Sequence, residues 1–526
     1  MSRPLLDRAE CRAEDKRAID AGVPGIVLME NAARGAADIF LRRFGAHLGR
    51  VLVLGGTGQN GGDAWALARH LKTRGVAPQV LMVAAAGVLS AKDRVQGDAR
   101  IALESLGAIG IEVRVATTKE EVETALREAT SVVDGLFGTG LTRPLEGLFL
   151  DAVKAINARA LPTLSLDMPS GVCASTGQVL GDAVRASITV TFHAEKLGLA
   201  QFPGAEYAGE IVLADMGVPP PAHATVWLRD AAWLQQSLTA RARDAHKGTG
   251  GHVFVVGGAP GKTGAALLAA RGALRGGAGL VTIAARGAAR AALDAKAVEL
   301  MTREVPEALE AGVRAVLDDA KRAAAFVVGP GLGTDDGTQA FVQRIALELP
   351  VPTVLDADAL APFCGPNLVL LQRAKARRVL TPHPAEAARL LGIDTEDIQR
   401  DRYSAAAELA SQSGQIVVLK GARTIIATSA MAQPLGKHAH ADTYVCGEGT
   451  PALGVAGTGD VLAGVIAAAL ASKDMLTKTW TDRVCEAVVA HALAGVLAAA
   501  GRDRGLFASE VADAVSYVLA PRATPF

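Results

Sequence analysis

The feature that most limits how this chain can fold is a repeated alternation of short apolar runs with alanine-rich stretches. The runs are rich in β-branched residues, lack polar–apolar alternation, and end in Gly, Asp or Pro. Such runs are typical of strands buried on both faces, as in parallel sheets covered by helices. The candidate strands are Arg50–Gly56, Gln79–Ala84, Ser131–Gly138, Pro162–Gly171, Ser187–Phe192, His252–Gly258, Gly279–Ala285, Ala325–Gly333, Pro352–Leu360, Arg377–Pro384 and Gln415–Gly421.

A proline-rich segment separates these candidates into two groups. Gly217–Trp227 contains three consecutive prolines, which cannot continue a helix or a central strand and favour an extended spacer. With 526 residues, 50% of them hydrophobic, the chain is long enough for two domains with full cores. We therefore predict two α/β domains, residues 1–222 and 223–526.

The composition argues against several classes of protein. Lys plus Arg number 54 and Asp plus Glu also number 54, so the net charge is zero, and aromatic residues make up 4%. Nucleic-acid-binding and membrane-surface proteins usually carry a basic patch or aromatic platforms. Five scattered cysteines without a CxxC pair indicate small buried side chains in a reducing compartment. Because the N-terminus lacks an apolar h-region and Val461–Ala471 is too short to span a bilayer, we expect a cytoplasmic protein.

A glycine-rich turn, Gly56–Asp63, follows the first candidate strand and precedes a helix. Gly56, Gly58 and Gly61 fit the GxGxxG pattern of dinucleotide-binding folds. That pattern also requires an acidic residue at the end of the next strand, but Leu81–Gly87 contains none. An ordinary Rossmann oxidoreductase is thus disfavoured, while a phosphate-binding turn at a helix N-terminus and a plain glycine turn both stay open.

Oxygen-bearing side chains follow two further candidate strands. Asp134 lies in VVDGLFGTGL, and Asp167 and Ser170 lie in LDMPSG. A single Asp at a strand end is more often a turn former than a catalyst. Several such groups at neighbouring strand ends, with amide and hydroxyl oxygens beside them, would suit a hard cation.

The motifs NGGD, VDGLFGTGL and LDMPSG, in this order, resemble the NAD(P)H-hydrate epimerase domain. The resemblance implies a Rossmann-like three-layer αβα fold that interconverts the R and S forms of the hydrate at nicotinamide C6. It implies K⁺ bound by Asn60, Asp134 and Ser170, and Asp167 as the catalytic carboxylate facing the substrate. It implies further substrate contacts by Gln59, Asn60, Gly61, Gly62, Asp63, Gly138, Thr139, Gly140, Leu141, Thr142, Arg143 and Pro144.

The glycine-rich segment Gly257–Gly264 in the second half does not match a Walker A motif. That motif needs Gly five positions before Gly261, where this chain has Val256. We therefore do not interpret Lys262 as a P-loop lysine, although the turn can still hold part of a ligand.

Three charged or titratable side chains in the second half are candidate site residues. His383 lies between two prolines that stiffen its backbone, and Lys420 follows a strand, so it can reach nucleotide phosphates. The alternatives are a structural or exposed histidine and a surface lysine. Asp460, in GVAGTGDVLAG, is either a helix N-cap or a base beside an anion hole formed by the amides of Gly457–Gly459. The two roles do not exclude each other, and the second suits phosphoryl transfer to a hydroxyl.

Five segments within Ala245–Gly464 resemble the ADP-dependent NAD(P)H-hydrate dehydratase, a ribokinase-like α/β domain. They are HKGTGGHVFVVGG, GPGLG, LTPHPAE, VLKGART and AGTGDVLAG, in this order. The resemblance implies contacts with the hydrated dinucleotide by Ala265, Gly331 or Gly333, His383 and Asp460. It implies contacts with ADP by Lys420, Gly421, Ala422, Arg423, Thr424, Gly457, Thr458 and Gly459. The chain departs from the two family patterns at Ala64, Met168 and Ala385, where Gly, Ile and Gly are commoner.

Nearly the whole chain thus resembles the bifunctional NAD(P)H-hydrate repair enzymes. We expect epimerisation of hydrated NADH and NADPH (NADHX and NADPHX), then phosphorylation of the S hydrate by ADP, with Asp460 as base and Mg²⁺ at the phosphates. Elimination would restore NADH or NADPH and release AMP and phosphate. We expect no nucleic-acid or membrane partner, and a homo-oligomer packed through helices such as Ala487–Ala500. The alternatives are a ribokinase-like kinase for a vitamin precursor or sugar, and a scaffold that binds dinucleotide without turnover.

Overall fold

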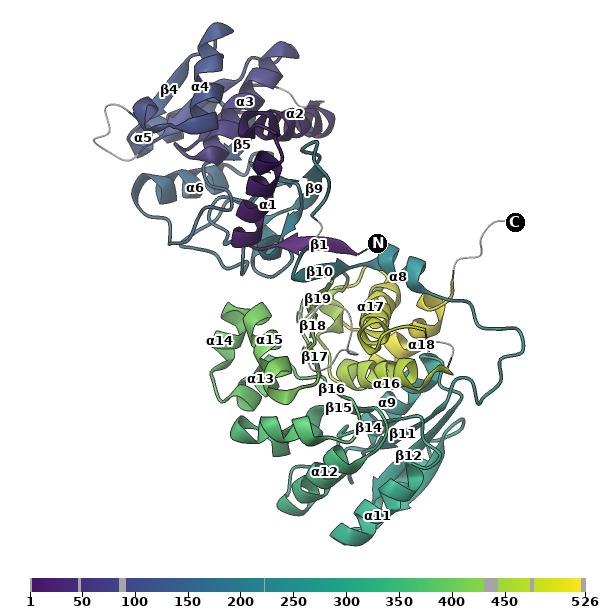
Figure 1. The fold of residues 1–526 in the computed structure, drawn as a ribbon. Helices are drawn as coiled ribbons and strands as arrows, with labels where there is room; N and C mark the ends of the chain where they lie inside the picture. The colour runs from purple at the N-terminus through teal and green to yellow at the C-terminus, as the bar shows by residue number, and fades with distance from the viewer. Residues whose placement is uncertain are drawn as a thin grey trace. The chain divides into compact units, whose positions relative to one another are not determined.

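The computed structural model describes residues 2–45, 49–84, 91–221, 223–429, 443–473 and 477–521. The chain forms two compact units, Arg3–Val226 and a second that begins at Trp227 (Figure 1). The last residues of the segment Leu81–Gly87 and Ala222, beside the predicted boundary, lie outside the described residues. Among the described residues, no helix is long and apolar enough to cross a membrane.

The first unit is built on a parallel sheet with the strand order β4-β3-β2-β5-β6-β7-β9. Its strands are β2 (Val51–Gly55), β3 (Gln79–Val83), β4 (Val113–Ala116), β5 (Ser131–Gly135), β6 (Thr163–Leu166), β7 (Ile188–Phe192) and β9 (Glu210–Ala214). Outside this seven-stranded sheet, β1 (Arg3–Leu6) pairs in parallel with β8 (Glu195–Lys196).

Both faces of this sheet are covered by helices. Val51 and Val53 of β2 belong to one hydrophobic cluster, and Leu52 and Leu54 belong to another on the opposite face. The first cluster includes side chains of α2 (Gly25–Phe44), α3 (Gln59–Thr73) and α4 (Gly97–Ala108), and the second those of α5 (Lys119–Glu128) and α6 (Gly147–Arg159). Helix α1 (Arg8–Asp20) follows β1, and α7 (Gly204–Tyr207) precedes β9. The unit is therefore a three-layer αβα sandwich, as predicted.

The second unit contains a parallel sheet in the order β13-β12-β11-β14-β15-β16-β17, extended antiparallel by β18 and β19 and then by β10. The strands are β10 (Val226–Arg229), β11 (His252–Val256), β12 (Leu280–Arg286), β13 (Met301–Val305), β14 (Ala325–Val328), β15 (Thr353–Leu355), β16 (Arg378–Leu380), β17 (Ile416–Leu419), β18 (Ile425–Ala427) and β19 (Thr443–Cys446).

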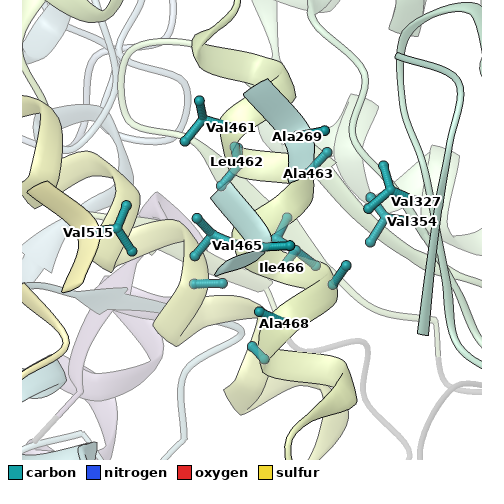
Figure 2. Close-up of a cluster of buried hydrophobic side chains, with 14 of the residues drawn as sticks. Ala269, Val327, Val354, Val461, Leu462, Ala463, Val465, Ile466, Ala468 and Val515 are labelled. Carbon is teal, nitrogen blue, oxygen red and sulfur yellow. The ribbon is translucent and has the colours of Figure 1, made fainter. Parts of the chain in front are cut away.

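Helices cover both faces of this sheet as well (Figure 1). One face carries α9 (Thr263–Arg275), α16 (Thr458–Ala471), α17 (Trp480–Ala499) and α18 (Ala508–Val518), whose apolar side chains form one core with the strands (Figure 2). The remaining helices are α8 (Ala231–Ser237), α10 (Ala289–Asp294), α11 (Leu309–Asp319), α12 (Asp336–Glu348), α13 (Pro384–Leu391), α14 (Thr395–Arg400) and α15 (Arg402–Ser413). The predicted α/β class is therefore confirmed for both halves of the chain.

Helices α9 and α16 pack with their main chains in contact. A Cβ atom added to Gly464 would lie 1.9 Å from the carbonyl oxygen of Ala269, and one added to Gly272 would lie 2.4 Å from that of Val461. Real side chains do not tolerate such distances, so glycine at both positions is what allows this close crossing.

The strands that the sequence analysis missed include the sheet edges. β4 and β9 end the first sheet and β13 ends one side of the second. Their burial patterns mix buried and exposed residues, because an edge strand is covered less completely than a central one. A search for continuous apolar runs finds central strands and passes over these.

The strand order reverses once in each parallel sheet, and the reversal indicates where a ligand can bind. In the first sheet β2 lies between β3 and β5, and in the second sheet β11 lies between β12 and β14. In open α/β sheets the crevice at the carboxyl ends of such strands is the usual ligand site.

Candidate active sites

A cavity of about 620 Å³ lies at the carboxyl ends of β2, β5 and β6 in the first unit. The predicted substrate residues Gln59, Asn60 and Asp63 line it from the start of α3, and Gly138–Leu141 line it from the loop after β5. Asp167, the predicted catalytic carboxylate, lines it from the end of β6. The structure therefore brings three separate predicted segments to one cavity.

Asp167 is held in an uncommon backbone conformation beside a buried lysine. It follows β6 directly, has a φ of 66°, and donates its backbone N–H to the carbonyl of Val190 at 2.7 Å. Lys196 Nζ donates hydrogen bonds to Asp167 Oδ1, to Thr191 Oγ1 at 2.9 Å and to Phe192 O at 2.8 Å. Only 3% of the Lys196 side chain is exposed, so this ammonium is held by the protein rather than by water.

The three predicted potassium ligands lie close to this cavity but differ in their surroundings. Asp134 is fully buried and accepts hydrogen bonds from Ser170 Oγ at 2.6 Å, Ser170 N at 2.9 Å and Ser165 Oγ at 2.8 Å. Burial raises the pKa of Asp134, although these hydrogen bonds oppose the change. Asn60, in contrast, has neither side-chain oxygen nor nitrogen hydrogen-bonded, and both atoms are buried.

Several residues that the epimerase resemblance implies are not among the cavity-lining residues. Gly61 and Gly62 are buried within α3, where an added Cβ would meet Gly56 O at 2.0 Å and Met29 Cε at 2.6 Å. These glycines allow tight packing of the helix against its surroundings. Thr142, Arg143 and Pro144 are exposed on the loop beyond Leu141. Whether they contact a substrate stays a prediction.

The cavity also contains residues that the sequence analysis did not single out. Lys196 comes from β8, and Cys11, Arg12 and Asp15 come from α1. Burial, reinforced by the negative charges of Asp167 and Asp15, raises the pKa of Asp63 well above its usual value. Burial raises the pKa of the Cys11 thiol to about 12. No local motif surrounds Cys11 or Asp15, so only the fold reveals their position.

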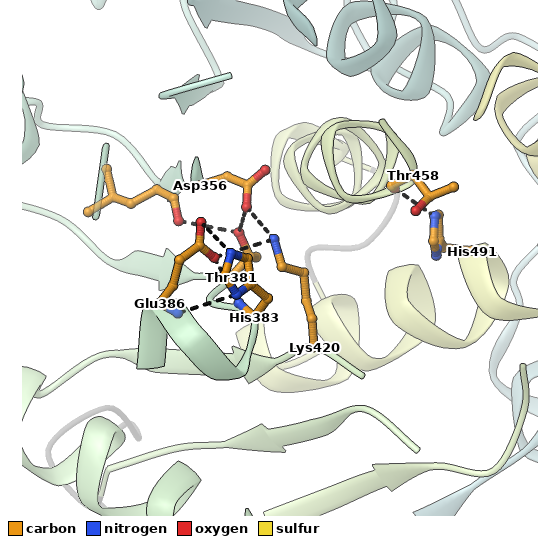
Figure 3. A network of polar contacts seen from close by, with 8 residues as sticks. Asp356, Thr381, His383, Glu386, Lys420, Thr458 and His491 are labelled. Atoms are coloured by element: carbon orange, nitrogen blue, oxygen red, sulfur yellow. Dashed lines mark hydrogen bonds and ion pairs between the residues drawn. The ribbon is translucent and has the colours of Figure 1, made fainter. Parts of the chain in front are cut away.

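In the second unit, polar side chains converge where three neighbouring strands end (Figure 3). Asp356, Thr381 and Lys420 are the first residues after β15, β16 and β17. Lys420 Nζ donates to Asp356 Oδ1 at 2.8 Å, and Thr381 Oγ1 donates to the same oxygen at 2.7 Å. Glu386 Oε2 lies 3.9 Å from Lys420 Nζ. Burial, the largest influence, would lower the pKa of Lys420, but Asp356 and Glu386 together raise it.

Asp460 lies in the first turn of α16, next to this network. The helix begins at Thr458 with Gly457 as N-cap at a φ of 95°, and no side chain caps it, so Asp460 is the third helical residue rather than the cap. A Cβ added to Gly459 would lie 3.3 Å from Lys420 Nζ, which places the ammonium directly beside the turn. Burial, with the negative charges of Asp356, Asp358 and Glu386 acting against Lys420, raises the pKa of Asp460 to about 7.

A buried histidine supports the same turn from α17. His491 Nε2 donates to the carbonyl oxygen of Thr458 at 2.9 Å (Figure 3). Thr458 Oγ1 donates to Leu453 O and Val455 O, both at 3.0 Å. Burial lowers the pKa of His491 to about 4, so the imidazole is neutral and this hydrogen bond persists at physiological pH. The first backbone N–H groups of α16 have no partner within the helix, as in any helix N-terminus, and can face an anion.

His383 is tied to the same network through Glu386. His383 is the N-cap of α13, its backbone N–H donates to Glu386 Oε2 at 2.8 Å, and Glu386 N donates to its Nδ1 at 3.3 Å. Burial lowers the pKa of His383, while Glu386 opposes that change. His383 therefore has a structural role as a helix cap, which the sequence analysis did not predict. Its side chain is 48% exposed, which leaves the ring free to meet a ligand as well.

The two glycine-rich loops near the β11–β14 reversal touch each other. Gly331 has a φ of 61°, and a Cβ there would lie 3.3 Å from Cβ of Ala265, at the start of α9. Gly333 N donates to Asp358 Oδ2 at 2.8 Å, and Lys262 Nζ lies 3.7 Å from that oxygen. The predicted dinucleotide residues Ala265, Gly331 and Gly333 are thus neighbours, and Asp358 links them electrostatically to Asp460.

The predicted nucleotide segment after β17 leaves the sheet in a turn. Gly421 and Ala422 are exposed, and Arg423 has a φ of 57° and donates from Nη1 to Gly447 O. Thr424 Oγ1 donates to Gly421 O at 3.0 Å, which closes the turn. Lys420, at the start of this segment, points instead into the acidic group of Asp356 and Glu386.

Comparisons with known proteins show the family of the chain. A family model described as NAD(P)H-hydrate dehydratase matches residues 253–516, and one described as YjeF-related protein N-terminus matches residues 25–198. The bifunctional NAD(P)H-hydrate repair enzyme Nnr of Moorella thermoacetica is 38% identical over 512 residues, which cover 94% of this chain and 93% of that protein. This chain belongs to the bifunctional NAD(P)H-hydrate repair enzyme family.

The family relationship extends to distant organisms. The bifunctional NAD(P)H-hydrate repair enzyme of Leishmania braziliensis is 31% identical over 543 residues, covering 96% of this chain and 92% of that protein. Among solved structures, the ADP/ATP-dependent NAD(P)H-hydrate dehydratase of Bacillus subtilis, co-crystallised with ATP and Mg²⁺, aligns with 55% of this chain and 95% of its own, at 27% identity and a TM-score of 0.46.

Membership of the repair enzyme family confirms the predicted combination of an epimerase and a dehydratase. The two family models match different halves of the chain, and the curated relatives span nearly its whole length. The kinase alternative is therefore not favoured. Residues 6–19, which supply part of the first cavity, precede the segment that the N-terminal family model matches.

Proposed function

We propose that residues 1–222 interconvert the R and S epimers of NADHX and NADPHX, and that residues 223–526 dehydrate the S epimer at the expense of ADP. Each unit supplies its own carboxylate, Asp167 in the first and Asp460 in the second, at the carboxyl edge of its sheet. Epimerisation by the first unit would supply the S epimer that the second unit dehydrates.

The observation that carries this proposal is the placement of Asp460. Its carboxyl group has a pKa of about 7, lies in the first turn of a helix with free N–H groups, and is close to the buried ammonium of Lys420. A base that titrates near neutrality is suited to take a proton from a hydroxyl. The helix amides and Lys420 offset the charge of a phosphoryl group at the same place.

The dehydration then proceeds in two balanced steps. Asp460 takes the proton of the C6 hydroxyl as that oxygen bonds to the β-phosphorus of ADP, and the phosphoanhydride bond breaks to release AMP. The C6–O bond then breaks with loss of a proton from C5, so that a C5–C6 double bond forms and inorganic phosphate leaves. The product is NADH or NADPH. We assign Lys420, Gly421, Ala422, Arg423, Thr424, Gly457, Thr458 and Gly459 to the nucleotide, and Ala265, Gly331, Gly333 and His383 to the dinucleotide.

In the epimerase, Asp167 faces the nicotinamide ring. The C6 atom of the hydrate carries both a hydroxyl group and the ring nitrogen. Removal of the hydroxyl proton by Asp167 allows the C6–N bond to open, its electron pair and a proton passing to nitrogen. Closure on the opposite face, with the proton returned, gives the other epimer. We assign Gln59, Asn60, Gly61, Gly62, Asp63, Gly138, Thr139, Gly140, Leu141, Thr142, Arg143 and Pro144 to substrate binding.

The residues near the first cavity fit a potassium ion. Asn60 has a buried carboxamide oxygen without a hydrogen-bond partner, and Asp134 and Ser170 offer further oxygens. Oxygen donors of this kind suit a hard monovalent cation. We propose that Asn60, Asp134 and Ser170 hold K⁺, which would supply fixed positive charge near the substrate phosphates.

The second site fits Mg²⁺ as a companion of the nucleotide rather than as a resident ion. Among the described residues, no three His, Cys, Asp or Glu side chains are arranged to hold a metal ion. Lys420 occupies the space between Asp356 and Glu386. Mg²⁺ commonly binds through substrate phosphates with few protein ligands. We propose that it enters with ADP and offsets phosphate charge there.

The preference for ADP, a cytoplasmic location and a homo-oligomeric state belong to the same proposal. The five cysteines are free, which agrees with a reducing compartment. The apolar α17 offers Val496 and Leu497 at its surface, 40% and 53% exposed, as a contact for a second copy.

The test mixes the full-length protein with NADHX and ADP and follows the recovery of near-ultraviolet absorbance of NADH. We expect recovery of both epimers, with AMP and phosphate formed in equal amounts. Replacing ADP by ATP identifies the preferred phosphoryl donor. A stable phosphorylated product would support a kinase instead, and binding of NADPH without consumption of ADP would support a scaffold.

A further inference from the structure

A buried lysine in the epimerase cavity donates all its hydrogen bonds to groups at the ends of two neighbouring strands. The three N–H groups of Lys196 are matched by three acceptors, Asp167 Oδ1, Thr191 Oγ1 and Phe192 O. Thr191 and Phe192 belong to β7, which pairs with β6, and Asp167 directly follows β6. The ammonium of Lys196 on β8 therefore connects the ends of β6 and β7. Burying an ammonium is costly unless it is paired in this way.

The two oxygens of Asp167 therefore have different surroundings. Oδ1 receives the hydrogen bond from Lys196 and lies 3.4 Å from both Thr191 Oγ1 and Phe192 N. Oδ2 points the other way, because a Cβ added to Gly138 would lie 3.3 Å from it and 3.2 Å from Asn60 Oδ1. Gly138 and Asn60 both belong to the segments assigned to the substrate. One oxygen is thus held by the protein and the other is presented to the ligand.

The backbone of Asp167 needs such a restraint. A φ of 66° is uncommon for a residue with a side chain, and it is maintained only where surrounding contacts determine it. The hydrogen bond from Asp167 N to Val190 O fixes the main chain, and Lys196 fixes the carboxylate.

We propose that Lys196 is the positioning residue of the epimerase: it binds Asp167 Oδ1 so that Oδ2 alone faces the substrate. This inference rests on the proposed role of Asp167 as the base. Lys196 acts through Asp167 and need not touch the substrate.

The other titratable groups around Asp167 leave this task to Lys196. Asp63 faces it from α3, and Asp15 and Cys11 face it from α1. Burial favours the neutral forms of Asp63 and Cys11, and His193 pairs with Glu14 at 3.3 Å rather than with Asp167. Among the described residues, Lys196 is the cation that pairs with Asp167.

The test compares three variants of the full-length protein: Lys196→Met, which removes the charge at similar size, Lys196→Arg, which keeps it, and Thr191→Val, which removes one anchor. The measured quantity is the rate at which purified R-NADHX yields NADH in the presence of ADP, corrected for spontaneous epimerisation. Dehydration of S-NADHX by the same preparation is the internal control for folding. Lys154→Met, an exposed lysine of α6, is the matched control variant.

For Lys196→Met we expect kcat of epimerisation to fall on the order of tenfold to a hundredfold with KM little changed, since misplacement of a catalytic group costs about that much. Lys196→Arg keeps a donor at this position and should recover part of kcat. Thr191→Val should lose less kcat than Lys196→Met, because Lys196 keeps its other two acceptors.

The inference is overturned if Lys196→Met retains wild-type kcat, or if it raises KM alone. Should that variant fail to fold, Thr191→Val still decides, since a variant that loosens Lys196 and keeps wild-type kcat contradicts the positioning role. A wild-type protein that does not convert R-NADHX would instead refute the proposed epimerase function itself.

Discussion

Each unit pairs a buried lysine with an aspartate, but only in the first unit is that aspartate the proposed base. In the first, the buried Lys196 contacts Asp167, the proposed base itself. In the second, the buried Lys420 contacts Asp356, and the proposed base Asp460 lies beside that pair without being part of it. One base is held by a cation, and the pKa of the other is raised to about 7 by burial and then by neighbouring acids.

The difference matches the chemistry proposed for each unit. Epimerisation is reversible, and its base must accept and return the same proton, which suits a carboxylate held in a fixed position. Dehydration transfers a phosphoryl group to the deprotonated oxygen, and a stronger base with a pKa near neutrality is better suited to that step. The lysine contacts the proposed base in the first unit and a neighbouring acid in the second, where burial is the largest cause of the raised pKa of the base.

The variant with the largest expected effect on this comparison replaces the proposed base of the second unit. Asp460→Asn should lower the rate of S-NADHX dehydration by roughly a hundredfold or more, the scale for losing a general base, and leave epimerisation unchanged. Asp513→Asn, at the surface of α18, is the matched control. If Asp460→Asn dehydrates normally, the two units do not share a carboxylate-based mechanism and Asp460 is only structural.

The reciprocal change addresses the first unit. Asp167→Ala should lower epimerisation of R-NADHX by roughly a hundredfold and leave the dehydration of S-NADHX intact, since each base serves its own site. Asp38→Ala, a carboxylate of α2 that pairs with Arg74 at 2.9 Å, is the control. Equal loss of both activities in Asp167→Ala would indicate a folding defect and would leave no functional division between the units.

A pair of variants tests why the second base titrates near neutrality. Asp356→Asn removes a negative neighbour of Asp460, so the pKa of Asp460 should fall and the acidic limb of dehydration should move to lower pH. Lys420→Met removes the opposing positive charge, so the limb should move to higher pH. Each shift should be about one pH unit, equivalent to roughly tenfold in rate on the acidic side.

The control for this pair is Lys478→Met, which breaks a comparably buried ion pair with Glu486 in the same unit. Its pH–rate profile should match that of the wild type. If the acidic limbs of Asp356→Asn and Lys420→Met move in the same direction, a general loss of structure, rather than charge, determines the change in the pKa of Asp460.

The smallest expected effect concerns the cation proposed for the first unit alone. Asn60→Ala should reduce the activation of epimerisation by K⁺ by up to about tenfold, as loss of one ligand or its support commonly does, and leave dehydration indifferent to K⁺. Rates in KCl and in choline chloride at equal ionic strength measure this. Equal activation of the variant and the wild type would place the cation elsewhere.

The sequence predicted most of what depends on neighbouring residues in the chain. Central strands, the glycine turns and Asp460 all have local patterns, and the structure places them at the expected strand ends or helix start. The edge strands β4, β9 and β13 were missed because partial exposure interrupts their apolar pattern.

The lysine–aspartate pairs could not be predicted from the sequence. Lys196 lies 29 residues from Asp167, and Lys420 lies 64 residues from Asp356. Each pair forms only because neighbouring strands align their ends, and no local spacing encodes that contact. For the same reason Lys420 was predicted to face phosphate but not to hold Asp356, and Lys196 was not noticed.

The glycine-mediated crossing of α9 and α16 has a mechanical consequence for turnover. Ala265 lies in the first turn of α9 and Asp460 in the first turn of α16, and the helices meet main chain to main chain at Gly272 and Gly464. Glycine leaves no side chain at either crossing point, so a larger residue there would push the two helices apart. That change would alter the distance between the proposed base Asp460 and the proposed dinucleotide contact Ala265.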